Sequence, residues 1–320
     1  MSRRWPGGFI SAVPGTTYSG MWTTQRQFIQ VTLGKWAGLA LYAFTSATFT
    51  SGTATGRIGP DLATARTGLT GTGTDAWKTN TAFFNTSNGI QLWTVPADGT
   101  YRIEVWGAQG GGGGYTGGFG SRMRGDFNLL NGQVIKILVG QTGGASYGGG
   151  GGMTAVATNT NTPLIVAGGG NTTSPWSSVL SHAVTTTSGL ASSNGVNAGG
   201  TDGGGGVGGA ALAGGAGFTG NGGASTCGST IAPLSFINGG TGGQTCNSIG
   251  GFGGGVASDG CCSGASGGGG GYSGGGGGNT SSITGGAGGS FNSGTNQSND
   301  NGNTGTATRV GNGQVIITKL

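Results

Sequence analysis

Between Lys136 and Arg309 the chain contains no lysine or arginine, and its acids there are Asp202, Asp259 and Asp300. The chain has 83 glycines among 320 residues, several times the usual content, and most of them fall in or near this stretch. Glycine loses the most backbone entropy on folding. Nucleic-acid binding depends on clustered Lys and Arg, so we expect no nucleic-acid partner here.

Glycine recurs at every third position in parts of this stretch, as at Gly214, Gly217, Gly220 and Gly223. Three residues per turn is the repeat of the polyproline-II conformation, which makes no internal hydrogen bonds. Buried backbone groups must therefore pair with neighbouring segments. The pattern predicts parallel and antiparallel polyglycine-II helices packed side by side. A disordered low-complexity tract is the alternative, although flexible linkers usually lack the aromatic residues present here.

Alternating apolar residues predict β structure over 76–140. A hairpin is expected between strands 90–95 and 101–106, because Pro96 and Gly99 suit a turn. Further strands are predicted at 126–130, 133–139, 154–157, 164–167 and 314–318. Helix is expected at 21–31, with one more turn at 62–66.

Four cysteines, Cys227, Cys246, Cys261 and Cys262, lie in the glycine-rich half. Their spacing does not fit a zinc site, and their even number favours disulfides, with three possible pairings. Buried free thiols are the alternative. Residues 1–15 lack the apolar core of a secretory signal, and no apolar run reaches the ~20 residues of a membrane helix. We therefore expect no signal peptide and no membrane insertion.

Catalytic chemistry has little support. His182 is the single histidine, and no Ser lies in a nucleophile-elbow motif. No glycine run ends as a phosphate-binding loop. We expect no enzymatic activity, cofactor or metal, although Asp98, Glu104 and Asp126 are the acids from which a glycosidase pair would be drawn.

Aromatic and imidazole side chains between the glycine runs are the candidate receptor contacts, because they give a large contact area at low entropy cost. They are Tyr115, Tyr147, Trp176, His182 and Tyr272. The alternative is that these rings seal the sides of the glycine-rich bundle.

From Trp93 onwards the motifs WTVPADGTYRIEVWGAQGGGGG, GDFNLLNGQVIKILVGQTG, GGGGGMTAVA, TPLIVAGGG, GGGGGYSGGGGG and GNGQVIITKL follow one another. This order resembles the glycine-rich module of the anaplastic and leukocyte tyrosine kinase receptors and of phage and bacterial glycine-rich proteins. The resemblance implies an all-β fold, a jelly-roll-like β-sandwich with an inserted domain of packed polyglycine-II helices. From it, together with the composition along the chain, we expect three parts: an attachment region (1–75), the sandwich (76–140 with 311–320) and the glycine-rich region (141–310).

The N-terminal segments GGFISAVPGTTYSGMWTTQRQ and TATGRIGPDLATARTGL resemble structural and tail-fibre proteins of tailed phages of the cyanophage type. This implies a virion protein, assembled in the host cytoplasm and exposed outside the cell. The expected role is a tail-fibre adhesin that contacts the host surface through its glycine-rich tip. The implied partners are other virion proteins and a host-surface glycan or protein, and a homotrimer is expected. A capsid or tail decoration protein and a polysaccharide depolymerase are the alternatives.

Overall fold

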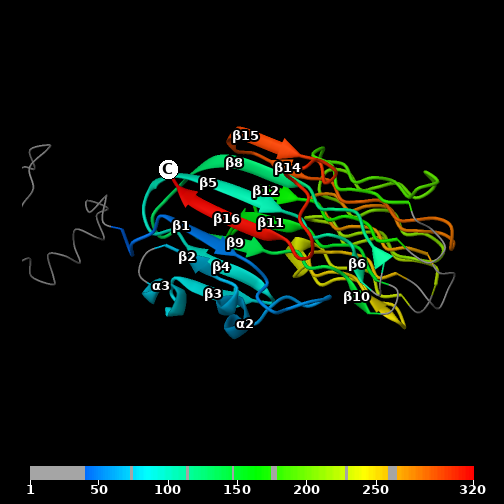
Figure 1. Cartoon of the computed structure of the whole chain (residues 1–320), viewed down its shortest axis with the longest axis horizontal. Coiled ribbons are helices and arrows are strands. Elements are labelled where there is room, and N and C mark those ends of the chain that lie inside the picture. Colours follow the sequence, from blue (N-terminus) through cyan, green and yellow to red (C-terminus); the bar gives the residue numbers. More distant parts are fainter. Residues whose placement is uncertain are drawn as a thin grey trace, which may run out of the picture. The chain divides into compact units, whose positions relative to one another are not determined.

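The computed structural model describes residues 40–72, 75–112, 115–145, 148–173, 179–227, 230–258 and 265–320. Backbone contacts divide the chain into 1–39 and 40–320, and the following description concerns the second unit. The helix predicted at 21–31 lies outside the described residues. Figure 1 shows strands at one end of the second unit and long extended segments running from them to the other end.

Two six-stranded antiparallel sheets form the strand-rich end, which confirms the all-β prediction (Figure 1). The first sheet has the order β15 (Thr295–Asp300), β8 (Arg122–Leu129), β5 (Gly99–Trp106), β16 (Gln314–Lys319), β1 (Ser46–Phe49) and β2 (Thr70–Gly71). The second has the order β14 (Phe291–Asn292), β12 (Pro163–Ala167), β11 (Thr154–Thr158), β9 (Val134–Leu138), β4 (Ile90–Thr94) and β3 (Phe84–Ser87).

Helices are few and short in the described residues. α2 (Leu62–Thr67) begins at Asp61, whose carboxylate accepts a hydrogen bond from the Thr64 N–H at 2.7 Å, as an N-cap should. It confirms the helical turn predicted at 62–66. α3 (Ala76–Thr79) and the 3-10 turn η1 (Phe236–Asn238) complete the set. None of the described helices is long and apolar enough to cross a bilayer.

The core lies between the two sheets and follows the period-2 alternation of their strands. β5 buries Tyr101, Ile103 and Val105, and β9 buries Ile135 and Ile137 against them. Each such side chain contributes about 1.5–3 kcal/mol when taken out of water.

The predicted hairpin between 90–95 and 101–106 is wrong. β4 belongs to the second sheet and β5 to the first, so the connection at 96–100 crosses between sheets. Trp93 and Tyr101 meet edge to face across the core, with ring centroids 5.8 Å apart. The Tyr101 hydroxyl donates to the Ala97 carbonyl at 2.8 Å and ties the crossing segment to β5.

The hairpin partner of β4 is β3, through the two-residue turn Asn88–Gly89. Both turn residues have positive φ, 50° and 80°, as a type I′ turn requires. Asn-Gly is the strongest short-range hairpin signal.

The sheets extend beyond the sandwich boundaries predicted from the sequence. β1 and β2 come from the region assigned to attachment, and β11, β12, β14 and β15 from the region assigned to polyglycine. Two small ribbons, β6 (Gly111–Gly112) with β7 (Tyr115–Thr116) and β10 (Gly144–Ala145) with β13 (Ser248–Ile249), lie among the extended segments.

Candidate recognition surface

The described extended segments within 107–120, 139–153 and 168–290 form what we call the glycine bundle. Three successive N–H groups of one segment donate to three different neighbouring segments, and the fourth N–H donates to the first neighbour again, three residues further along it. The N–H groups of Gly269, Gly270, Gly271 and Tyr272 donate to the carbonyls of Gly286, Gly151, Ala216 and Gly289 respectively. This three-residue repeat is the lateral bonding that polyglycine-II helices need.

Antiparallel neighbours in the bundle show the same repeat. The amides of Leu212, Gly215 and Phe218 donate to the carbonyls of Gly278, Gly275 and Tyr272 at 3.2, 2.7 and 2.8 Å. Each step of three residues along one segment matches three residues backwards along the other. Parallel and antiparallel segments are therefore present together, as the sequence predicts.

The segments approach so closely that side chains do not fit between them. A β-carbon added to Gly110 would lie 1.8 Å from the Asn171 carbonyl oxygen, and one added to Gly150 would lie 1.9 Å from that of Gly268. At Gly274 the same distance, to the Gly215 oxygen, is 1.9 Å. At these positions the segments meet through backbone atoms and glycine is required by close approach, whereas Leu212, Val256 and Ala265 fill a small apolar cluster elsewhere in the bundle.

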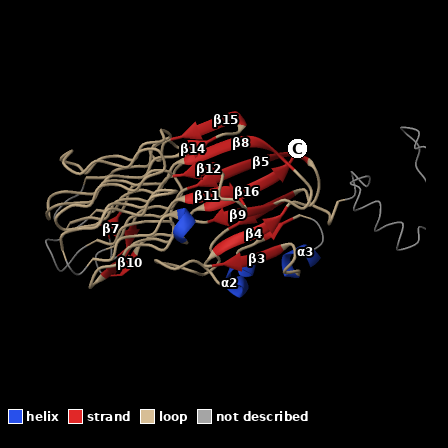
Figure 2. Cartoon of the chain, turned by 180° about the vertical axis from the view of Figure 1, so that it is seen from behind, coloured by secondary structure: helices blue, strands red, loops and turns tan. Residues whose placement is uncertain are grey.

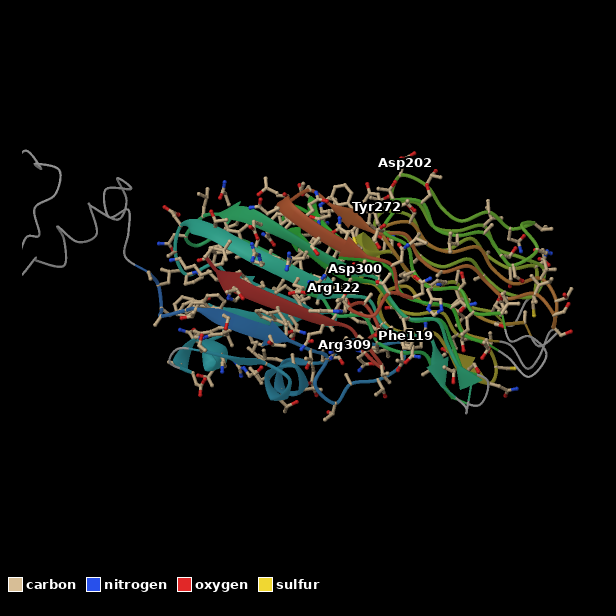
Figure 3. All side chains as sticks on the ribbon, turned by 45° about the horizontal axis from the view of Figure 1, so that its top comes forward. Phe119, Arg122, Asp202, Tyr272, Asp300 and Arg309 are labelled. Carbon is tan, nitrogen blue, oxygen red and sulfur yellow. The ribbon has the colours of Figure 1, made fainter. Side chains whose placement is uncertain are left out.

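The longest part of the bundle, within 168–290, leaves β12 and returns to β14. Its turns alternate between the end near the sheets (proximal) and the far end (distal). Aromatic rings from four proximal turns pack on or near the outer face of the second sheet; they are Phe218, Phe236, Phe252 and Tyr272. Phe218 stacks on Phe236 with centroids 4.5 Å apart, and Tyr272 stacks on Phe291 at 4.7 Å. Tyr272 therefore attaches the bundle to the sandwich and lies away from the distal turns (Figure 3).

The described residues of the distal turns, 193–197, 209–212, 226–227, 230–231, 245–248 and 279–284, form the candidate recognition surface. Hydrogen bonds connect several of them: the Asn279 Oδ1 accepts from the Asn197 Nδ2 at 3.0 Å and from the Ala210 N–H at 2.7 Å. The Thr226 hydroxyl donates to the Ala210 carbonyl at 3.1 Å. The turns are thus held relative to one another.

The side chains exposed on this surface are uncharged in the described residues. Most are small polar groups, with single branched apolar ones between them; they include Ser193, Asn194, Val196, Thr226, Ile231, Thr280 and Ser282. The sequence analysis predicts aromatic contacts and does not select these residues. Their signal was the clustering of Ser, Thr and Asn between glycine runs, which is typical of turns.

Two of the four cysteines lie in distal turns. Cys227 and Cys246 are both disulfide-bonded, and Cys261 and Cys262 lie outside the described residues. A disulfide restricts the unfolded chain. It therefore offsets part of the entropy that the glycines lose on folding.

The remaining predicted contacts are placed unevenly. Tyr115 belongs by its backbone to β7, but its side chain is not described, and Tyr147 and Trp176 lie outside the described residues. His182 is half-buried: its Nδ1 accepts from the Phe119 N–H at 3.0 Å, and its ring stacks on Phe119 at 5.7 Å. Burial lowers the pKa of His182.

Two of the carboxylates considered for a glycosidase are held in ion pairs on the outer face of the first sheet. Arg102 donates through Nε and Nη2 to both oxygens of Asp126 at 2.8 and 2.9 Å. This interaction holds the pKa of the Asp126 carboxyl below its usual value. Arg122 bridges Glu104 and Asp300, the latter at 2.7 Å, and Figure 3 places Arg122 beside Asp300.

The third of these acids, Asp98, accepts a hydrogen bond from the Asn131 N–H at 2.7 Å. No group of three or more His, Cys, Asp or Glu side chains that could bind a metal occurs among the described residues. A scan of the chain against models of known protein families finds no match.

Proposed function

We propose that the chain is a structural virion protein of a tailed phage, a tail-fibre or adhesin component whose distal turns contact the host surface. The observation that carries the proposal is the glycine bundle, a frame without lysine or arginine whose segments meet largely through backbone atoms and end in hydrogen-bonded polar turns. In such a frame a substitution in a turn leaves the interior packing unchanged. Loops on a rigid scaffold are where binding residues usually lie.

The chemistry of the distal turns fits a neutral, hydroxyl-rich or amide-rich partner. Asn, Ser and Thr side chains both donate and accept hydrogen bonds, and the exposed Val196 and Ile231 add small apolar contacts. The resemblance of the N-terminal motifs to phage tail-fibre proteins supports the same role, with other virion proteins as assembly partners.

Competition for adsorption tests the proposal. Purified full-length protein should reduce adsorption of the phage to its host, and Val196→Arg should weaken this competition because it puts a charge on the distal surface. The matched control is Val310→Arg, an equally apolar and 78% exposed residue that lies outside the distal turns. Equal competition by both variants, or none by the native protein, would contradict an adhesin role.

A capsid or tail decoration protein is the second candidate, favoured by the close-packed, disulfide-linked bundle. Fab fragments raised against the purified protein distinguish the two when bound virions are imaged. Label at the tail tip supports the adhesin, whereas label distributed over the head or tail tube supports decoration. Measurement of the native mass tests the expected homotrimer.

A further inference from the structure

Two neighbouring hollows lie where the outer face of the second sheet meets the glycine bundle. One, of about 330 Å³, lies between β4, β9 and η1; the other, of about 320 Å³, lies beside residues 57–59. Both are lined by Asn88, Asn238 and Gly239, so they form one depression, which we call the junction groove. η1 is the unlabelled blue turn between the strands and the extended segments in Figure 2.

Three carboxamides surround this groove. Asn88 comes from the β3–β4 turn, Asn161 from the β11–β12 turn, and Asn238 ends η1. Asn88 and Asn161 have φ of 50° and 63°, in the left-handed region that Asn tolerates better than most residues. Asn161 Oδ1 accepts from Lys136, and Asn238 Nδ2 donates to Asn221 Oδ1 at 2.9 Å. A carboxamide has two donor hydrogens and two acceptor lone pairs, and this further capacity suits the hydroxyls of a sugar.

One cation lines each hollow. Lys136 Nζ donates to Asn161 Oδ1 at 2.8 Å, and Arg57 Nε donates to the Gly242 carbonyl at 3.0 Å. Neither takes part in an ion pair within the described residues. No Asp or Glu lines either hollow, so the groove is positively charged and complements an anionic ligand.

Apolar side chains form part of the lining of the groove, between its polar groups. Ile90, Leu92 and Phe236 lie in the first hollow and Phe252 in the second, while Ile58, 68% exposed, stands at the edge. Apolar walls with a few placed polar groups are typical of small-ligand pockets, whose volumes run to about 300–1,000 Å³. The C–H faces of sugar rings match these apolar side chains.

An extended peptide fits this site less well than a glycan. Peptides that bind sheets usually add a strand to a free edge, but the groove lies on a sheet face. There the backbone of β4 already pairs with β3 and β9. Recognition must therefore come from side chains, and the side chains present are carboxamides, cations and apolar groups.

We propose that the junction groove binds a short segment of an acidic polysaccharide, with Lys136 and Arg57 facing its anionic groups and the three asparagines bonding its hydroxyls. This site is separate from the distal turns. It does not depend on the adhesin role, since a decoration protein would bind the same ligand.

Calorimetry with full-length protein tests the inference. The probes are tetragalacturonate, its neutral methyl ester, and a sulfated galactan tetrasaccharide with its desulfated form. We expect binding of at least one acidic probe, weakening as salt rises, and none of the neutral forms. The two acidic probes distinguish a carboxylate from a sulfate as the source of charge.

Substitutions then locate the site. Lys136→Gln and Arg57→Gln should each weaken binding about tenfold, the usual effect of losing a charge-assisted contact. The thermal midpoint of each variant is measured alongside, because Arg57 also donates to the Gly242 carbonyl and to Gln244 Oε1. Lys319→Gln, which removes a cation from β16 of the other sheet, and Val196→Arg should bind like the native protein.

Three results would overturn the proposal: no binding of acidic probes at millimolar concentration, equal binding of neutral forms, or undiminished binding by both groove variants. Exchange protection of residues 87–92 in a dimeric free protein that binds no glycan would instead assign the groove to a second copy of the chain.

Discussion

Gly152 and Phe252 approach each other so closely that a β-carbon on Gly152 would lie 1.7 Å from the Phe252 carbonyl oxygen. The same oxygen accepts the Gln141 N–H at 2.9 Å, and the Gly152 N–H bonds to the Gln141 carbonyl at 3.0 Å. Three segments thus meet through backbone atoms alone. A methyl group at this point would separate all three.

Gly152→Ala should therefore destabilise the protein strongly. Inserting a carbon into a close-packed interior costs about 1–3 kcal/mol, and sometimes more. We expect a cost at the upper end here, because the obstructing atom is the Phe252 backbone oxygen, which cannot move aside by changing rotamer. The measurement is the thermal unfolding midpoint of purified protein, with soluble yield recorded if the variant does not fold.

Gly144→Ala is the matched control. Gly144 also lies in the bundle, but the nearest atom to its added β-carbon is Ile249 Cγ1 at 3.6 Å, an ordinary contact. We expect this variant to unfold near the native midpoint. Equal stability of the two variants would contradict the view that glycine in the bundle is selected by close approach.

The bundle was predictable because its signal is local. Glycine at every third position indicates a three-residue repeat, and the lack of lysine and arginine together with the aromatic residues indicates that the segments pack. Which turns lie next to the sheets was not predictable, since that depends on counting every reversal of the chain. In the structure the rings of Phe218, Phe236 and Phe252 lie in proximal turns.

The positions of β4, β5, β8, β9, β11, β12 and β16 were also predictable, but those of the other strands in the two sheets, and the strand partners, were not. Alternation in β4 and β5 shows which side chains are buried, yet gives the same pattern whether two strands pair within one sheet or face each other across a core. β15, with the sequence TNQSND, has no apolar alternation at all. It joins the first sheet through backbone pairing with β8 and the ion pair between Asp300 and Arg122.

Reduction of the disulfides should loosen the distal end of the bundle before the sandwich. Cys227 and Cys246 are disulfide-bonded in distal turns, and a disulfide typically contributes about 2–4 kcal/mol. Under reducing conditions we expect faster amide exchange at 221–227 and 244–249, with β5 unchanged. Cys227→Ser should reproduce part of the effect without reductant. Uniform exchange throughout the protein, or no change in these turns, would contradict this assignment.

The single histidine should make stability fall in mild acid. Burial lowers the pKa of His182 in the folded state, whereas the unfolded chain titrates near the ordinary value of about 6.5. Below that pH the unfolded state binds more protons, so the free energy of unfolding decreases as pH falls. Denaturant titrations between pH 7.5 and about 5 measure this decrease.

His182→Asn provides the comparison, because the Asn carbonyl can accept the Phe119 N–H in place of Nδ1 but does not titrate. Its stability should change less over the same pH range. An identical pH dependence in both proteins would assign the effect to another group.

At lower pH the ion pairs of the first sheet should fail. Arg102 holds the pKa of Asp126 below its usual value, and the Thr306 hydroxyl and Arg122 do the same for Asp300. A lowered carboxyl pKa stabilises the fold above the unfolded pKa of about 3.9, and this stabilisation is lost as pH falls through the folded value.

Asp300→Asn should therefore release β15 already at neutral pH, seen as faster amide exchange at Thr295–Asp300 than in β5. Asp75→Asn is the control, since Asp75 is 79% exposed in its pair with Lys78 and such surface pairs contribute little. If both variants leave β15 equally protected, backbone pairing alone holds that strand.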